Sequence, residues 1–174
     1  DDMVSRGLGD VYKRQDYPWL KKEKAFIKMA VEEKGIPFLG LCLGHQLLAE
    51  SLGGVVGKSE TAEVGVMEVQ LTEEGASGIL FDGIPEKISC LQWHGAEIKK
   101  LPAGAKVLAT SKDCAVQAMS WGPRAYSMQF HVEIEHSTIA DWSTISEYAD
   151  SLKAALGPSG QEKLEKDCAV HMND

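Results

Sequence analysis

The chain has 174 residues, of which 44% are hydrophobic, so it is long enough for one domain with a substantial core. Its 18 basic and 26 acidic side chains give a net charge of −8, which argues against a nucleic-acid partner or an anionic membrane surface. No apolar run approaches the roughly 20 residues that a membrane-spanning helix requires.

Residues 1–15 contain no signal-peptide apolar segment and no periodic pattern that continues into the following sequence. The run at residues 9–15 resembles the translated transposon end that is left in sequencing libraries. We therefore expect residues 1–15 to be a non-native or disordered tail without chemistry, and residues 16–174 to form one domain.

The first half of that domain shows a helix, a strand and a second helix. Apolar residues at helical spacing predict a helix over residues 19–34, ended by Gly35. The apolar run at residues 36–39 predicts a buried strand. A second helix is predicted over residues 45–52, because two glycines follow it and end the pattern.

The rest of the domain contains clustered strands and then two helices. Strands are predicted over residues 64–71, 88–93, 106–111, 114–121 and 124–131, and helices over residues 137–156 and 161–172. The last three strands are closely spaced and separated by turn residues, which favours antiparallel pairing between them. The whole order predicts an α/β fold with three layers: a mostly parallel central sheet, helices on both faces and a small antiparallel extension.

Cys42 lies at the centre of the sequence GLCLGHQ, residues 40–46, directly between a predicted strand and a predicted helix. Such a turn exposes the sulfur and points a helix N-terminus at it, which favours thiolate over thiol. Gly40 and Gly44 permit the strained backbone that a nucleophile elbow needs. The pattern predicts that Cys42 is a nucleophile.

A thiol nucleophile needs a base, and the base needs a group that orients it. The sequence QFHVE, residues 129–133, ends a predicted strand, so His131 and Glu133 are expected to point to the same side. Glu133 can then accept a hydrogen bond from one imidazole nitrogen while the other faces the thiol. A His-x-Glu pair alone is weak evidence of a catalytic role. It is stronger evidence here because the Cys42 elbow lies upstream in the same chain.

These two motifs, in this order, resemble those of the class I, triad-type glutamine amidotransferases. The similarity extends from residue 16 to the C-terminus. Residues 63–65, 93–95, 141–142 and 147–148 resemble the stand-alone relatives of the GMP synthase amidotransferase domain. The resemblance implies a flavodoxin-like fold and hydrolysis of glutamine to glutamate and ammonia through a cysteinyl thioester.

The same resemblance implies a set of site residues. Cys42 would be the nucleophile, His131 the general base and then acid, and Glu133 its orienting carboxylate; the backbone N–H of Leu43 would be an oxyanion donor; Gln46, Trp93 and Gly95 would bind substrate. Two alternatives stay open, since Gln46 can simply hydrogen-bond a loop and Trp93 can be a core residue. For His45 and His94 a packing or solvent-facing role is favoured over a catalytic one.

The sequence departs from the family pattern at three places. Val132 replaces the usual proline between the histidine and the glutamate, and Ala96 stands where many relatives carry an acidic residue. The family's first strand and glycine-rich turn, with a second oxyanion donor, would precede residue 19, where this chain has only the predicted tail. We therefore expect the 174-residue chain to be weakly active or inactive.

Three functions remain open at this point. The first is an amidotransferase that passes ammonia to a synthetase or acceptor enzyme, the second a γ-glutamyl amide or peptide hydrolase on the same fold, and the third an inactive binding domain. The four cysteines form no CxxC pair, and the sequence shows neither a metal-ligand cluster nor a phosphate-binding glycine loop. We expect no metal, no nucleotide cofactor, no disulfide scaffold and a cytoplasmic location.

Overall fold

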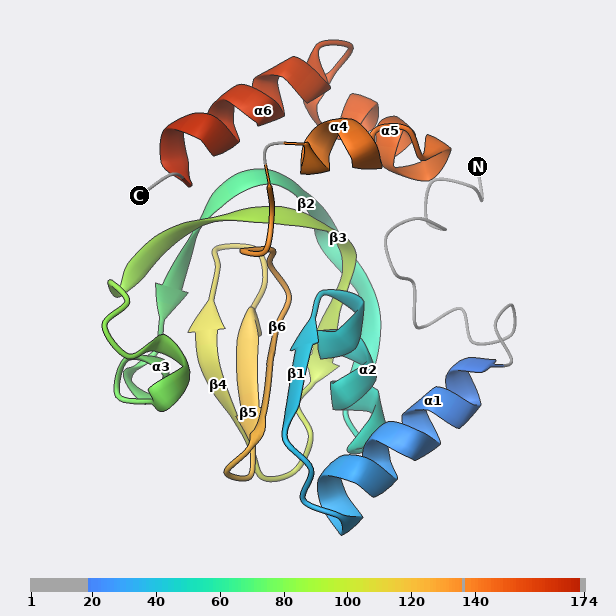
Figure 1. The fold of residues 1–174 in the computed structure, drawn as a ribbon, viewed down its shortest axis with the longest axis vertical. Helices are drawn as coiled ribbons and strands as arrows, with labels where there is room; N and C mark the ends of the chain where they lie inside the picture. The colour runs from blue at the N-terminus through green and yellow to red at the C-terminus, as the bar shows by residue number, and fades with distance from the viewer. Residues whose placement is uncertain (1–18, 136, 173–174) are drawn as a thin grey trace.

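The computed structural model describes residues 19–135 and 137–172, so the predicted tail at residues 1–15 lies outside the described part of the chain. No helix within that part combines the length and apolar character needed to cross a bilayer. The elements, in chain order (Figure 1), are α1 (Trp19–Lys28), a π-helical turn (Met29–Glu33), β1 (Phe38–Leu41), α2 (Leu43–Ser51), β2 (Val55–Leu71), α3 (Glu73–Ala76), a 3₁₀ turn (Ile79–Phe81), β3 (Lys87–Lys100), β4 (Ala105–Thr110), β5 (Ala118–Trp121), β6 (Ala125–Met128), α4 (Thr138–Trp142), α5 (Ser146–Leu156) and α6 (Gly160–His171).

The strands form one six-stranded mixed sheet in the order β1-β6-β5-β4-β2-β3. The α/β class and the antiparallel triplet β4-β5-β6 are as predicted. The share of parallel pairing is smaller than the sequence predicted. β1 and β6 form the only parallel pair among the described strands, and the other pairings are antiparallel. The antiparallel part is therefore larger than the small extension expected from the sequence.

Alternating side chains of the sheet enter separate apolar clusters, as the two-residue period of a strand requires. In β6, Ala125 packs in the cluster beneath α1 and α2, whereas Tyr126 and Met128 pack in the cluster beside α3 and the 3₁₀ turn. Helices α1 and α2 thus lie against one face of the sheet, and the short α3 lies beside β4 (Figure 1). Ser127 is buried on the α2 side, where its hydroxyl meets the ring of His45.

A third apolar cluster joins the long β2–β3 pair to the C-terminal helices. These helices form a layer above the end of the sheet at which β1 stops (Figure 1). The single helix predicted over residues 137–156 is wrong: the structure has two helices, α4 and α5, separated by residues 143–145. The hydroxyls of Ser143 and Thr144 donate to the carbonyls of Ile139 and Asp141. These bonds satisfy carbonyl groups at the C-terminal end of α4, where the chain turns away from the helix.

Candidate active site

Cys42 occupies a sharp turn between β1 and α2, as its motif predicts. Its φ of 47° and ψ of −100° make it the only non-glycine residue with a positive φ in the described part of the chain. Gly40 allows this turn, because a Cβ at that position would lie 2.6 Å from backbone atoms of Gly44. A Cβ at Gly44 would meet nothing within 4 Å, so the close approach requires glycine at position 40 only.

The surroundings of the sulfur oppose its ionisation in the free protein. Burial raises the pKa of the Cys42 thiol to about 12, and the charge of Glu133 acts in the same direction. Hydrogen bonds from the N–H of Leu43 and from Gln129 Nε2, which lies 3.5 Å from Sγ, act against that rise. The expectation of a resting thiolate is therefore wrong, because desolvation outweighs the helix N-terminus. A thiol in these surroundings could act as a nucleophile only if a base took its proton.

His131 and Glu133 follow the end of β6, and His131 forms an isolated bridge with Leu91 of β3. The N–H of His131 donates to the carbonyl of Leu91 at 2.9 Å, which fixes the backbone. Its Nδ1 donates to Glu133 Oε1 at 2.6 Å, and the N–H of Val132 donates to Oε2 at 2.9 Å. Burial alone would raise the pKa of Glu133, but these hydrogen bonds lower it below its ordinary value. Nε2 is thus the imidazole nitrogen that is left to accept a proton.

The parallel pairing of β1 with β6 brings the two motifs together. Leu41 lies opposite Met128 in the register, and the N–H of Cys42 donates to the carbonyl of Met128 at 2.9 Å. The segments that follow β1 and β6 therefore leave the sheet at the same end, where both strands have their carboxyl ends. Carboxyl ends of adjacent parallel strands are a common place for catalytic residues.

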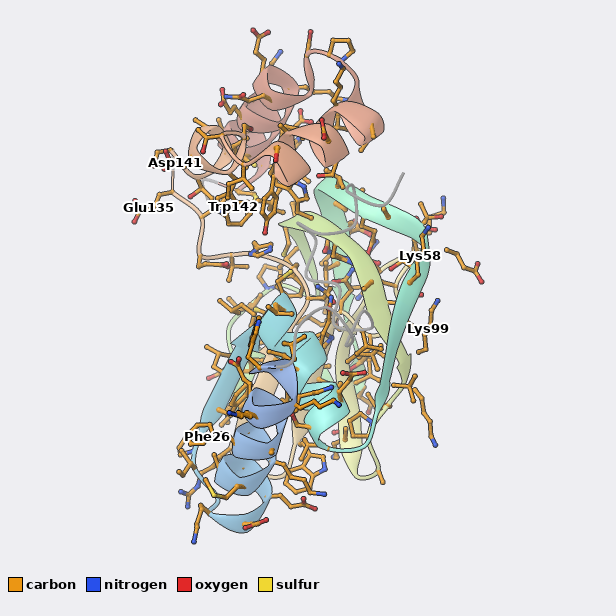
Figure 2. The ribbon with its side chains drawn as sticks, turned by 90° about the vertical axis from the view of Figure 1, so that its right-hand side faces the viewer. Phe26, Lys58, Lys99, Glu135, Asp141 and Trp142 are labelled. Atoms are coloured by element: carbon orange, nitrogen blue, oxygen red, sulfur yellow. The ribbon has the colours of Figure 1, made fainter. Side chains whose placement is uncertain are left out.

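Three aromatic side chains lie beside this edge, between the sheet and the C-terminal helices. Trp142 contacts the ring of His131, with centroids 4.9 Å apart, and Trp93 and Tyr148 each lie 5.6 Å from Trp142. Figure 2 shows Trp142 at the junction between the helical layer and the sheet. Burial chiefly, and repulsion by the Cys42 sulfur when it is ionised, raise the pKa of Tyr148.

The chain matches the model of the class I glutamine amidotransferase family over residues 3–142. It belongs to that family. Among curated amidotransferase relatives, a GMP synthase [glutamine-hydrolyzing] subunit of Thermococcus kodakarensis is 41% identical over 107 residues, or 61% of this chain and 55% of the relative. The GMP synthase [glutamine-hydrolyzing] of Clostridium novyi is 33% identical over 155 residues, or 79% of this chain and 30% of the relative. The chain thus spans about half the length, 55%, of the GMP synthase subunits that it matches.

Solved amidotransferase structures agree with this assignment. A glutamine amidotransferase from Thermotoga maritima superposes with a TM-score of 0.76 at 32% identity, covering 90% of this chain and 64% of the other. A glutamine amidotransferase from Methylobacillus flagellatus gives a TM-score of 0.71 at 28% identity, covering 90% and 61%. The α/β fold of this amidotransferase chain is therefore that of its family.

The residues assigned to substrate binding lie in different surroundings. Gln46 is fully buried and donates to the carbonyl of Ala96 and to Gln129, so its amide is engaged inside the protein. The Trp93 side chain is 1% exposed and donates to Ser151, as a core residue would, and Gly95 is half-buried. A substrate role for Gln46, Gly95 and the backbone at Trp93 stays a prediction.

His45 and His94 are both buried, and internal hydrogen bonds satisfy their rings. His45 lies between Ser127 and the carbonyl of Val116, and His94 lies between Glu63 and the carbonyl of Ala96. The packing role favoured from the sequence is therefore confirmed. In the described part of the chain, no three His, Cys, Asp or Glu side chains are placed to hold a metal ion.

Gln129 contacts Cys42, although no role for Gln129 was predicted from the sequence. Its amide reaches the sulfur, and its position two residues before His131 puts it on the same side of an extended segment. That two-residue spacing is the signal that could have identified it.

Proposed function

We propose that this protein hydrolyses the side-chain amide of glutamine to glutamate and ammonia through a thioester on Cys42. The observation that carries the proposal is the juxtaposition of the Cys42 elbow with the His131–Glu133 pair at one sheet edge, in a chain of the class I amidotransferase family. The elbow supplies a nucleophile, and the pair supplies a base with a fixed tautomer.

Acylation begins when the Cys42 thiol gives its proton to His131 Nε2 and the sulfur attacks the carboxamide carbon. The carbonyl oxygen becomes an oxyanion, and the proposed donor to it is the N–H of Leu43, which begins α2. The tetrahedral intermediate collapses as His131 returns the proton to the nitrogen. Ammonia leaves, and the γ-glutamyl group stays on the sulfur.

Deacylation uses the same groups with water in place of the thiol. His131 takes a proton from water, the hydroxyl oxygen attacks the thioester carbon, and the C–S bond breaks. The sulfur regains a proton from His131, and glutamate leaves. Glu133 stays ionised throughout and stabilises the imidazolium, because its hydrogen bonds hold its pKa low.

The ammonia is proposed to pass to an acceptor on a partner synthetase. Relatives of this chain are named as one subunit of a GMP synthase, which supports a second protein as partner, and the Clostridium novyi relative is a longer chain. Cys42, Cys90, Cys114 and Cys168 are all free thiols, which supports the proposed cytoplasmic location.

The test is glutamate release from glutamine and from several γ-glutamyl amides, by the protein and by Cys42→Ala. Cys168→Ala is the matched control, because Cys168 lies in the cluster of the C-terminal helices. We expect one ammonia for each glutamate, with a low turnover in the 174-residue chain that is lost in Cys42→Ala and retained in Cys168→Ala. Turnover confined to γ-glutamyl conjugates would identify the hydrolase instead, and turnover that survives Cys42→Ala would overturn the mechanism.

A further inference from the structure

We infer that Gln129 is a further catalytic residue, whose amide donates a hydrogen bond to the Cys42 sulfur, and that Gln46 is a positioning residue that fixes the direction of this bond. The inference deepens the proposed function, since it rests on Cys42 being the attacking group. It is carried by a continuous line of hydrogen bonds that runs from the sulfur into the interior.

Gln129 is fully buried and is held from both ends. Its backbone N–H donates to the carbonyl of Gln117 at 2.8 Å, which ties it to the strand beside it. Its Nε2 lies 3.5 Å from Cys42 Sγ, within the reach of a hydrogen bond to sulfur. A side chain with this placement touches the reacting atom itself.

The direction of that contact depends on Gln46. Gln46 Nε2 donates to the carbonyl of Ala96 at 3.4 Å and to Gln129 Oε1 at 3.1 Å. A backbone carbonyl can only accept, so reversal of the Gln46 amide would place two oxygens together. Because Gln46 presents N–H groups, Gln129 must turn its oxygen toward Gln46 and its N–H toward the sulfur.

The carbonyl of Ala96 is in turn held by a buried contact between His94 and Glu63. It accepts from His94 Nδ1 at 3.0 Å, and His94 Nε2 lies 3.0 Å from Glu63 Oε2. Both ring nitrogens of His94 therefore face oxygen atoms of the interior. Glu63 also accepts from Ser111 and from Gln117, each within 2.8 Å. The line of hydrogen bonds thus ends in a buried carboxylate that is fixed by three donors.

This arrangement matters because burial makes the sulfur hard to ionise. A hydrogen bond to an anion is about twice as strong as one to a neutral group, so the Gln129 bond strengthens as the proton leaves the thiol. Had the amide faced the other way, its oxygen would oppose the developing negative charge. Gln129 therefore stabilises the sulfur anion only while Gln46 holds it in this orientation.

The test uses alkylation of Cys42, which needs no glutamine and so separates this inference from the proposed function. The rate constant is measured at pH 8 with iodoacetamide and with a bulkier haloamide, followed on the Cys42 peptide by mass spectrometry. We expect Gln129→Met to slow both reactions about tenfold, the loss of one hydrogen bond to a charged group. Equal slowing with both reagents marks a change at the sulfur and not in access.

Met119→Ala is the matched control, because Met119 is fully buried in the cluster under α2 and is apolar. It is expected to lower the unfolding temperature and leave the alkylation rate unchanged. If Gln129→Met does not fold, Gln129→Asn serves in its place: it keeps a buried amide that is one methylene too short, and the same slowing is expected. A folded variant that reacts within about twofold of the parent overturns the role of Gln129.

The role of Gln46 is tested with Gln46→Met and the double variant. If Gln46 acts through Gln129, Gln46→Met slows alkylation by about threefold alone and has no further effect when Gln129→Met is already present. Effects that multiply in the double variant would show that Gln46 acts on the sulfur by another route, and would overturn its positioning role.

Discussion

The indole of Trp142 lies edge-on to the imidazole of His131, with ring centroids 4.9 Å apart and planes inclined at 71°. Glu133 holds the same imidazole through Nδ1, at 2.6 Å. The two contacts constrain different properties of His131, the proposed base, because the carboxylate selects the tautomer and the indole restricts the tilt of the ring. They can therefore be tested separately.

Replacing Trp142 should weaken catalysis with a smaller effect on substrate binding. In Trp142→Ala the His131 ring gains freedom to tilt away from the sulfur, and we expect kcat to fall about tenfold with KM changed less. Steady-state glutaminase kinetics measure both constants. Trp121→Ala is the control, because Trp121 bonds to Ala103 at the opposite end of β5 and should leave kcat unaltered.

Glu133→Gln should lower kcat by about 10²-fold or more, because a neutral amide neither fixes the tautomer with certainty nor stabilises the imidazolium. The low pKa of Glu133 implies that the parent enzyme keeps this carboxylate ionised until the pH falls below the usual range of a glutamate. Glu135→Gln is the matched control, since Glu135 is exposed on the same segment (Figure 2). An equal loss in both variants would contradict the specific role of Glu133.

His45 should make the protein sensitive to acid. Burial lowers the pKa of His45 from 6.5 to about 4, and its Nε2 donates to the carbonyl of Val116 while Nδ1 accepts from Ser127. Below pH 6.5 His45 binds a proton in the unfolded chain, whereas in the folded protein it stays neutral until about pH 4. The free energy of unfolding therefore falls as the pH drops through that window. We expect a loss of roughly 2 kcal/mol by about pH 5 from this group.

Urea unfolding at a series of pH values measures this loss. His45→Gln should be less stable near neutral pH and should show a shallower decline toward acid. His171→Gln is the control, because His171 is exposed at the end of α6 and should keep the slope of the parent.

The two glycines that flank Cys42 should respond differently to alanine. Gly40→Ala places a Cβ 2.6 Å from the Gly44 backbone, and we expect a loss of at least about 2 kcal/mol in unfolding free energy because the elbow must move. Gly44→Ala meets nothing within 4 Å and lies in α2, so its stability should stay within about 0.5 kcal/mol of the parent or rise. Similar destabilisation by both changes would contradict the observed turn.

The features that the sequence predicted well depend on neighbours in the chain. The elbow at Cys42 follows from glycine placement, and the Glu133–His131 contact follows from the two-residue period of an extended segment. The stop of the first helix at Gly35, whose φ is 62°, is local in the same sense. Each of these depends on a few consecutive residues.

The features that it missed depend on distant partners. β2 begins nine residues before the predicted strand because its polar first half pairs with the second half of β3, and that pairing also places Glu63 opposite His94. The resting state of the Cys42 thiol is set by burial beneath other elements, which outweighs the local helix N-terminus. The amide of Gln129 contacts Gln46, which in turn bonds to the carbonyl of Ala96, and nothing in the motif around Gln129 encodes these contacts.

The positive φ of Cys42 means that the residue proposed as the nucleophile also lowers the stability of the fold. A residue with a side chain in such a conformation costs of the order of 1–3 kcal/mol, whereas glycine adopts it freely. Selection for heat resistance without selection for turnover would therefore tend to replace the nucleophile itself. The Cys42→Gly variant, expected to be inactive, should have the higher free energy of unfolding. It would be a suitable form in which to capture an intact amide substrate in a crystal.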